Sequence, residues 1–136
     1  MREFPGTSET PFVRTDFSNE RVWREIVEAV GRESPDGFRA YVSIIDDIGF
    51  SGASAEDLAG LAAQAGAHRL LLVADSATMR HVERPILCID LLETLRTIRA
   101  TPGALWSIEN NLSLANLDFE DFVEAADHDG IYRGLD

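Results

Sequence analysis

The chain has 136 residues, of which 45% are hydrophobic, and this size and composition suit one packed domain. It carries 24 acidic and 12 basic residues, so its formal net charge is -12, and every basic residue is an arginine. The absence of lysine excludes Schiff-base chemistry and lysine-based phosphate binding, and the negative charge argues against direct binding of nucleic acid or of an anionic membrane.

The N-terminal part of the chain predicts a tail, a strand and a helix. Residues 1–11 are expected to form a flexible tail, and residues 12–136 are expected to form a single α/β domain. The apolar segment Phe12–Arg14 is typical of a short strand. The following helix is predicted to start at the N-cap Ser18, to bury one apolar face and to end at Gly31.

The middle of the chain alternates predicted strands and helices. A strand over Phe38–Ile45 is followed by a helix whose start is indicated by Ser54, with Asp57 three residues later, and whose end is indicated by Gly66. The run Arg69–Asp75 is apolar without alternation. This pattern favours a central strand that is covered on both faces.

The C-terminal half predicts a hairpin and then two further elements. Pro85–Leu92 and Leu95–Ala100 are expected to pair as antiparallel strands, because the link between them is too short for a crossover helix. Residues 104–108 fit either a helix or a strand. A final helix is predicted to begin at Asp118, which is a suitable N-cap.

The order β-α-β-α-β-β-β-α-α predicts an α/β fold. We expect a single domain with a mixed or mostly parallel sheet of about five strands and helices packed on it. The single cysteine, Cys88, lies in a predicted buried strand and is expected to fill the core. The chain shows neither the apolar core of a signal peptide nor a run of about 20 apolar residues, which predicts a cytoplasmic protein that does not enter a membrane.

Aspartates stand where four predicted strands end. Because the carboxyl ends of parallel strands meet at one edge of a sheet, these carboxylates favour a Mg²⁺ site, for which the candidate ligands are Asp16, Asp46, Asp47 and Asp75. Asp90 ends the fourth of these strands. The alternative explanation is local, since aspartate is common in turns and helix caps directly after a strand. Apart from Mg²⁺ under the first hypothesis, no cofactor is predicted.

A phosphorylated substrate would also need a cationic group to hold it, and here only arginine can serve. No recognisable phosphate-binding motif surrounds any of the arginines considered for this role, which are Arg14, Arg39, Arg69, Arg80 and Arg84.

The C-terminal quarter of the chain is strongly acidic. From Glu109 to Asp136 there are eight acidic residues and one arginine. The adjacent Asn110 and Asn111 indicate amide groups with dedicated partners, either as structural caps or as ligand contacts. This quarter is predicted to be a surface for a basic partner, and its interface candidates are Trp106, Glu109, Asn110, Asn111, Asp118, Glu120, Asp121 and Glu124.

Four segments together resemble a family of small actinobacterial proteins that is classed as a domain of unknown function. They are Val13–Phe17, Val73–Asp75, Trp106–Phe119 and Asp129–Gly134. The resemblance extends from about Phe12 onward. It implies a stand-alone cytoplasmic domain of this length and brings no activity, cofactor or catalytic residue with it.

Three functions remain open from the sequence. The first is a non-catalytic acidic protein-binding module for a basic protein, including an immunity or inhibitor type that covers a cationic active site. The second is a magnesium-dependent enzyme that acts on a phosphorylated or nucleotide substrate through the strand-end aspartates. The third is a homodimeric structural domain with the Trp106 region as its interface.

Overall fold

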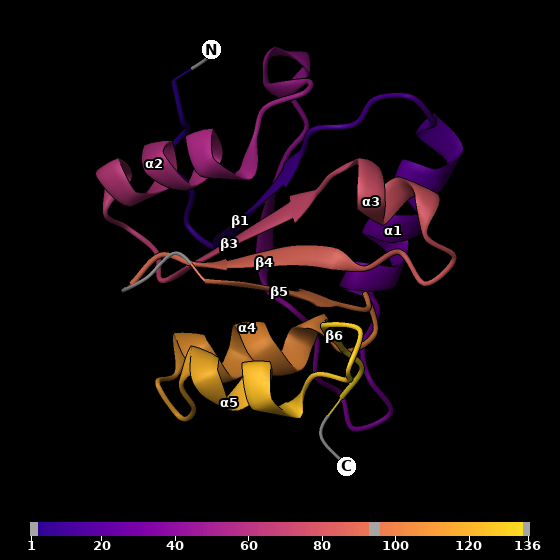
Figure 1. Cartoon of the computed structure of the whole chain (residues 1–136), viewed down its shortest axis with the longest axis vertical. Coiled ribbons are helices and arrows are strands. Elements are labelled where there is room, and N and C mark those ends of the chain that lie inside the picture. The colour runs from indigo at the N-terminus through magenta and orange to yellow at the C-terminus, as the bar shows by residue number, and fades with distance from the viewer. Residues whose placement is uncertain (1–2, 93–95, 135–136) are drawn as a thin grey trace.

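Six strands form one mixed sheet in the computed structural model, which describes residues 3–92 and 96–134 (Figure 1). The strands are β1 (Thr10–Arg14), β2 (Val42–Ile45), β3 (Leu70–Ala74), β4 (Ile86–Asp90), β5 (Thr97–Ala100) and β6 (Ile131–Tyr132). The helices are α1 (Glu20–Gly31), the 3₁₀ turn η1 (Ile48–Phe50), α2 (Ala55–Ala65), α3 (Ser76–Arg80), α4 (Leu105–Ser113) and α5 (Phe119–Ala125).

The strand order is β2-β1-β3-β4-β5-β6. Strand β1 pairs in parallel with β2 and β3, whereas β4 runs antiparallel to both of its neighbours, and β5 pairs in parallel with β6. The α/β class, the mixed sheet and the β4–β5 hairpin are therefore confirmed. Among the described residues, no helix combines the length and the apolarity that crossing a membrane requires.

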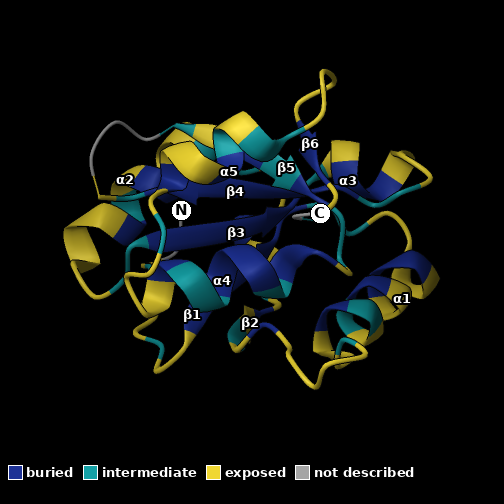
Figure 2. Ribbon diagram, turned by 90° about the horizontal axis from the view of Figure 1, so that it is seen from below, coloured by how far each residue is buried: buried dark blue, intermediate teal, exposed yellow. Residues whose placement is uncertain are grey.

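Helices cover both faces of the sheet and divide the core into two clusters. Helices α1, α4 and α5 pack on one face, where Phe12, Leu72 and Cys88 lie. Helix α2 and the turn η1 pack on the other face, where Val13 and Val73 lie. Figure 1 shows the sheet between these two layers, and Figure 2 shows strands β3 and β4 in the colour of buried residues. This arrangement explains why β3 is apolar at every position, since alternate side chains enter opposite clusters.

The predicted starts of α1 and β2 are wrong, in each case because a polar side chain accepts a hydrogen bond from a backbone N–H group. Helix α1 is capped by Asn19, not by Ser18, since the Ser18 N–H donates to Asp16 Oδ1 at 2.8 Å and delays the helix by one residue. Strand β2 covers only the last four residues of the predicted Phe38–Ile45. The N–H of Tyr41 donates to a side chain of α4 and is lost to strand pairing.

Other predicted features are confirmed or extended. Ser54 Oγ caps α2 by accepting from the Asp57 N–H, and Gly66 ends the helix with a left-handed φ of 68°. Residues 104–108 lie in α4 and at its N-cap, which resolves the choice between helix and strand. Strand β1 begins at Thr10, inside the segment predicted as a tail.

The patterns in the sequence predicted neither α3 nor β6. Helix α3 has five residues and β6 has two, so neither is long enough to display a hydrophobic period. Tyr132 of β6 is nevertheless fully buried, and its ring packs edge-on against Phe122 at a centroid distance of 5.2 Å.

The buried Cys88 carries a first prediction. Burial raises the pKa of its thiol to about 12, so the reactive thiolate is scarce at ordinary pH and reagents cannot reach the sulfur. We expect the native protein to be inert to a thiol-specific chromogenic reagent at mildly alkaline pH, and the urea-unfolded chain to react with one equivalent. Rapid labelling of the native protein would show that β4 opens far more often than its packing implies.

Candidate functional site

The strand-end aspartates separate into two groups in the structure. Strands β1, β2 and β3 are parallel, so their carboxyl ends lie at the same end of the sheet. This end carries Asp16, Asp46 and Asp75, with Asp47 next to Asp46. Asp90 lies at the opposite end of the strands, beside the start of β3, because β4 runs antiparallel to β3. The predicted convergence depends on parallel strands, so it applies to Asp16, Asp46 and Asp75 and does not include Asp90.

Two of these aspartates serve as local caps. Hydrogen bonds from Ser18 hold the pKa of the Asp16 carboxyl below its ordinary value. Asp47 Oδ1 accepts from the Gly49 N–H at 2.8 Å and caps η1. Both roles match the local explanation, in which aspartate after a strand organises the next turn.

Asp75 is tied to two elements at once. It caps α3 through the Thr78 N–H at 3.1 Å, and its two oxygens accept from the Arg99 guanidinium at 2.9 and 2.8 Å. Burial acts to raise the pKa of the Asp75 carboxyl, but these hydrogen bonds and the Arg99 charge hold the pKa below its ordinary value. In the described ranges, no group of three or more His, Cys, Asp or Glu side chains is arranged to hold a metal ion.

Arg14 lies at the same end of the sheet and pairs with two carboxylates there. Its side chain is only 2% exposed, and it donates from Nη1 to Asp46 Oδ1 at 3.2 Å and from Nη2 to Glu20 Oε2 at 2.8 Å. The guanidinium carbon lies 4.3 Å from the ring centre of Phe17 and 5.0 Å from that of Trp23. Arg14 thus joins β1, the end of β2 and the start of α1, and it neutralises part of the acidic edge.

The interface candidates of the C-terminal quarter do not share one surface. Glu120, Asp121 and Glu124 are exposed on α5, and Asp118 lies just before that helix, where its N–H donates to the Asp121 carboxylate at 2.8 Å. Glu120 forms an ion pair with Arg96. The acidic residues of α5 are thus partly occupied by contacts within the chain.

The two asparagines and Trp106 also have partners within the fold. Asn111 Nδ2 donates to the Ser107 carbonyl at 2.7 Å, and Asn110 Nδ2 donates to the Arg39 carbonyl at 2.9 Å. The Trp106 ring stacks on Phe38 with a centroid distance of 5.0 Å and an interplanar angle of 12°. Both amide groups thus have partners within the chain, as the adjacent asparagines indicated.

Glu109 is buried, not part of an acidic surface. It is 3% exposed, and its oxygens accept from four neutral donors, the N–H of Tyr41 at 2.7 Å, Asn110 Nδ2 at 3.1 Å, Thr10 Oγ1 at 3.1 Å and Ser113 Oγ at 2.6 Å. In the part of the chain that the structure describes, no arginine pairs with it. Glu109 therefore clamps α4 to β1 and to the segment that leads into β2.

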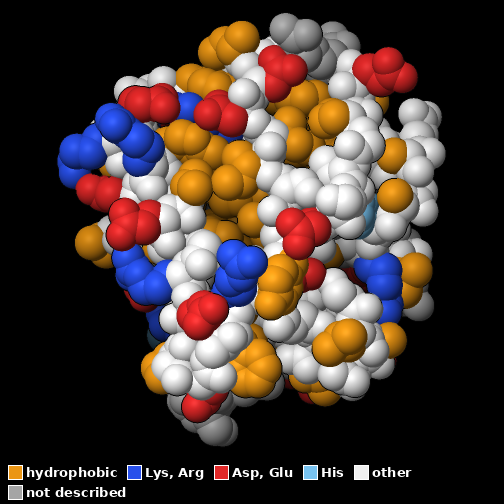
Figure 3. All heavy atoms as spheres, turned by 180° about the vertical axis from the view of Figure 1, so that it is seen from behind, with side chains coloured by type: hydrophobic (Ala, Val, Ile, Leu, Met, Phe, Trp, Pro, Cys, Tyr) orange, Lys and Arg blue, Asp and Glu red, His pale blue; other side chains and the backbone are white. Residues whose placement is uncertain are grey.

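The segment that Glu109 clamps leads into β2 and carries exposed large hydrophobic side chains. Strand β2 is an edge strand, and in the described structure its outer side pairs with no other strand. Figure 2 places β2 at the side of the molecule that Figure 3 shows, where hydrophobic side chains gather with acidic and basic groups around them. We call this surface the β2 edge face and define it by its exposed side chains, Phe38 (48%), Tyr41 (47%), Ile44 (45%) and Ile48 (64%).

Two hollows flank the β2 edge face and meet at Glu9 and Tyr41, which line both. One hollow, of about 190 Å³, lies between β2 and the apolar side of α1, with Val27 and Ile44 in its wall. The other, of about 310 Å³, reaches from Tyr41 to the buried Glu109. The wall of the first hollow is therefore largely apolar, with Glu9 and Arg39 as its charged groups, and the second hollow contains the carboxylates of Glu9 and Glu109.

Sequence reasoning treated Phe38–Ile45 as an ordinary strand and missed this surface. A hydrophobic run has the same pattern whether its strand lies at the edge or in the centre of a sheet. The chain connections contained a weak signal. Strand β2 follows β1 through one helix and pairs with it, and β3 pairs with the other side of β1, so β2 is left at the edge of the sheet.

The arrangement defines a small α/β domain with an open mixed sheet and an exposed parallel edge. Residues 9–135 match the sequence model of the DUF6924 family, which is described as a domain of unknown function. The chain belongs to that family. This match confirms the predicted resemblance to an uncharacterised family over nearly the whole chain. A comparison with the curated proteins finds no match.

Proposed function

We propose that the chain is a non-catalytic, acidic protein-binding domain that takes an extended basic segment of a partner protein along the β2 edge face. The observation that carries the proposal is the unpaired outer side of β2 together with its exposed apolar side chains. Exposed edge strands bind extended segments by adding a strand, with side-chain pockets beside the backbone that provide specificity.

The two edges of the sheet differ in a way that supports this role. At the far edge, β6 has only two residues, and both are buried. Short and covered edges protect a sheet against pairing with other chains. Among the described residues, β2 has four residues and Ile44 is exposed on it, and no further strand pairs with its outer side. This contrast supports β2 as the edge that takes the partner.

Charge determines which kind of segment fits. Glu9 lines both hollows, and Asp46 and Asp47 follow the C-terminal end of β2. Arg39, which also lines the apolar hollow, lies over the Tyr41 ring at 4.9 Å. With a net charge of -12, a second copy of this chain meets long-range repulsion, whereas a basic partner is attracted. An immunity or inhibitor role, in which the domain covers a cationic active site, fits this chemistry.

The test uses a fluorescent peptide that alternates lysine and valine, with a matched glutamate–valine peptide as the charge control. We expect the basic peptide to raise fluorescence anisotropy at low salt and to lose affinity as salt is added. Ile44→Ser is expected to weaken binding by about tenfold, which corresponds to ~1.4 kcal/mol. Val82→Ser is the matched control, because Val82 is an exposed aliphatic side chain, at 87%, outside the β2 edge face.

Two results would contradict the proposal. One is equal binding of the acidic and basic peptides, which would remove the role of charge. The other is equal weakening by Ile44→Ser and Val82→Ser, which would remove the role of the β2 edge face. Circular dichroism of both variants establishes that each retains the native fold.

A further inference from the structure

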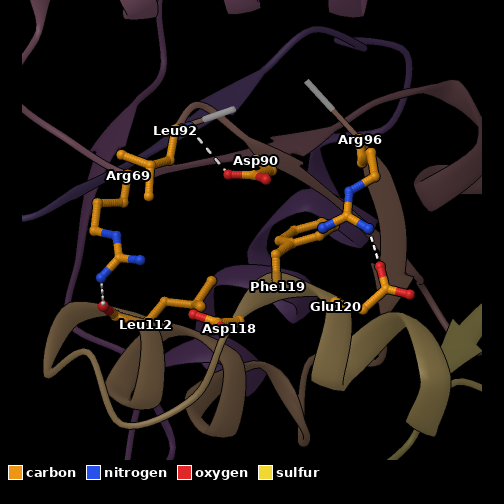
Figure 4. A pocket seen from close by; sticks show the side chains of 8 residues that line it. All are labelled: Arg69, Asp90, Leu92, Arg96, Leu112, Asp118, Phe119 and Glu120. Atoms are coloured by element: carbon orange, nitrogen blue, oxygen red, sulfur yellow. Dashed lines mark hydrogen bonds and ion pairs between the residues drawn. The ribbon is translucent and has the colours of Figure 1, made fainter. Parts of the chain in front are cut away.

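A pocket of about 170 Å³ lies where β3 begins and β4 ends (Figure 4). This is the end of the strands opposite to the one that carries Asp16 and Asp75. Its roof is the sheet, with Asp90 in it, and its floor is formed by Leu112 at the end of α4 and Phe119 at the start of α5. The proposed binding of a protein partner does not involve this pocket.

The two arginines of the pocket have unused hydrogen-bonding capacity. Within the described part of the chain, the Arg69 guanidinium makes one hydrogen bond, from Nη1 to the Leu112 carbonyl at 3.1 Å. Arg96 pairs through Nη1 with Glu120, and its guanidinium carbon lies 5.6 Å from the centre of the Phe119 ring. Figure 4 shows these two side chains on opposite sides of the pocket.

Arg96 Nε is the one buried side-chain nitrogen or oxygen without a hydrogen-bond partner in residues 3–92 and 96–134. Buried donors without a partner are rare in folded proteins, and each needs an explanation, such as a ligand that completes it. An acceptor that enters the pocket can supply this missing partner.

The acidic side of the pocket is also incomplete. Asp90 is 6% exposed, and its Oδ1 accepts from the Leu92 N–H at 3.0 Å. Among the described residues, Asp90 Oδ2 has no donor, and Arg69 forms no ion pair with Asp90. Because Arg96 Nε is the one buried polar side-chain atom without a partner among the described residues, Asp90 Oδ2 is accessible from the pocket and can accept from a cationic donor there. Asp118 adds a second carboxylate at the pocket.

We propose that this pocket binds a small zwitterion, namely an α-amino acid with an apolar side chain. The ligand carboxylate would accept from Arg96 Nε, and the ammonium group would donate to Asp90 Oδ2. The apolar side chain would contact Leu112 and Phe119, which lie on the floor. The volume is below the roughly 300–1,000 Å³ of sites for drug-sized molecules, which limits the ligand to a small one.

The balance of charge favours a zwitterion over a simple anion. Two guanidinium groups and three carboxylates line the pocket, and Arg96 and Glu120 already form a pair. Arg69, Asp90 and Asp118 remain, so a purely anionic ligand would meet two uncompensated carboxylates. A ligand with both charges satisfies the cationic and the acidic side together.

Titration calorimetry of the full chain with alanine, valine and leucine tests the proposal. We expect saturable binding of at least one of them and a rise in melting temperature with the same preference. The N-acetylated amino acid lacks the ammonium group, and the corresponding alkylamine lacks the carboxylate. Both are expected to bind at least tenfold more weakly. No binding of any of the three amino acids at millimolar concentration, or equal binding of the N-acetylated form, would overturn the proposal.

Two variants locate the site. Asp90→Asn preserves the oxygen that accepts from Leu92 and removes the charge, so we expect the fold to persist and the dissociation constant to rise by at least tenfold. Asp57→Asn is the control, because Asp57 lies on α2 and lines a different hollow, and only its backbone N–H takes part in the Ser54 cap. Equal affinities of Asp90→Asn and Asp57→Asn would refute the assignment to this pocket.

Discussion

Replacement of Arg14 by methionine is expected to lower the free energy of unfolding by about 1.5–3 kcal/mol, because the hydrogen bonds of its buried guanidinium to two partly exposed carboxylates are lost. Methionine fills part of the buried volume but cannot pair with Asp46 or Glu20, so the acidic edge loses its buried cation. It also lacks the charge that lies over the rings of Phe17 and Trp23. Urea denaturation followed by tryptophan fluorescence measures the change, since Trp23 lies directly beside the substituted position.

Two further variants separate this effect from a general response to the loss of an arginine. Arg14→Lys retains the charge, but one ammonium group cannot reproduce the planar contacts of a guanidinium, so an intermediate loss is expected. Arg21→Gln removes an exposed pair with Glu25 on α1 and is expected to cost less than about 0.5 kcal/mol. If Arg14→Met costs no more than Arg21→Gln, Arg14 is not the cation that holds this edge together.

The substitution Glu109→Leu is expected to cost about 3 kcal/mol, because several buried donors lose their acceptor at once. Glu109→Gln is expected to cost only about 1 kcal/mol. The hydroxyls of Thr10 and Ser113 can rotate and accept from the new amide, while the amide oxygen still accepts from the Tyr41 N–H. The order of the two variants in urea denaturation is therefore the diagnostic result, with Glu124→Gln on the exposed side of α5 as control.

Amide hydrogen exchange gives a second readout of the same clamp. In the native chain we expect the Tyr41 N–H to exchange slowly, although it lies outside β2, because the Glu109 carboxylate accepts it at 2.7 Å. In Glu109→Leu this amide should exchange at least tenfold faster than in the native chain. Fast exchange of Tyr41 in the native chain would contradict the role of Glu109 as an anchor for the segment that leads into β2.

Local sequence patterns predicted a structural element correctly where the contacts that determine it lie close together in the sequence. The cap of α2 depends on Ser54 and the backbone three residues later, and its end depends on the left-handed Gly66. The continuous apolar run of β3 reports its burial on both faces. The start of α1 was predicted one residue too early, because Asp16 and Asn19 compete with Ser18 for the same short stretch of backbone.

The candidate sites depend on contacts that no local pattern contains. Glu109 was assigned to an acidic surface from the charge of its neighbours, but its partners Thr10 and Tyr41 lie 99 and 68 residues away in sequence. The pocket of Figure 4 brings together Arg69, Asp90 and Phe119 from three distant segments of the chain. Neither grouping produces a spacing or a motif that can be recognised in the chain.

The amino-acid sequence alone was enough to predict the α/β class and the buried position of Cys88 and to establish the net negative charge, because composition and short-range periodicity carry that information. The tertiary structure decided which strand is the open edge, which carboxylates are already paired and which polar groups around the sheet remain incomplete. These properties depend on strand order and on the direction of β4, and both are determined by contacts between distant segments.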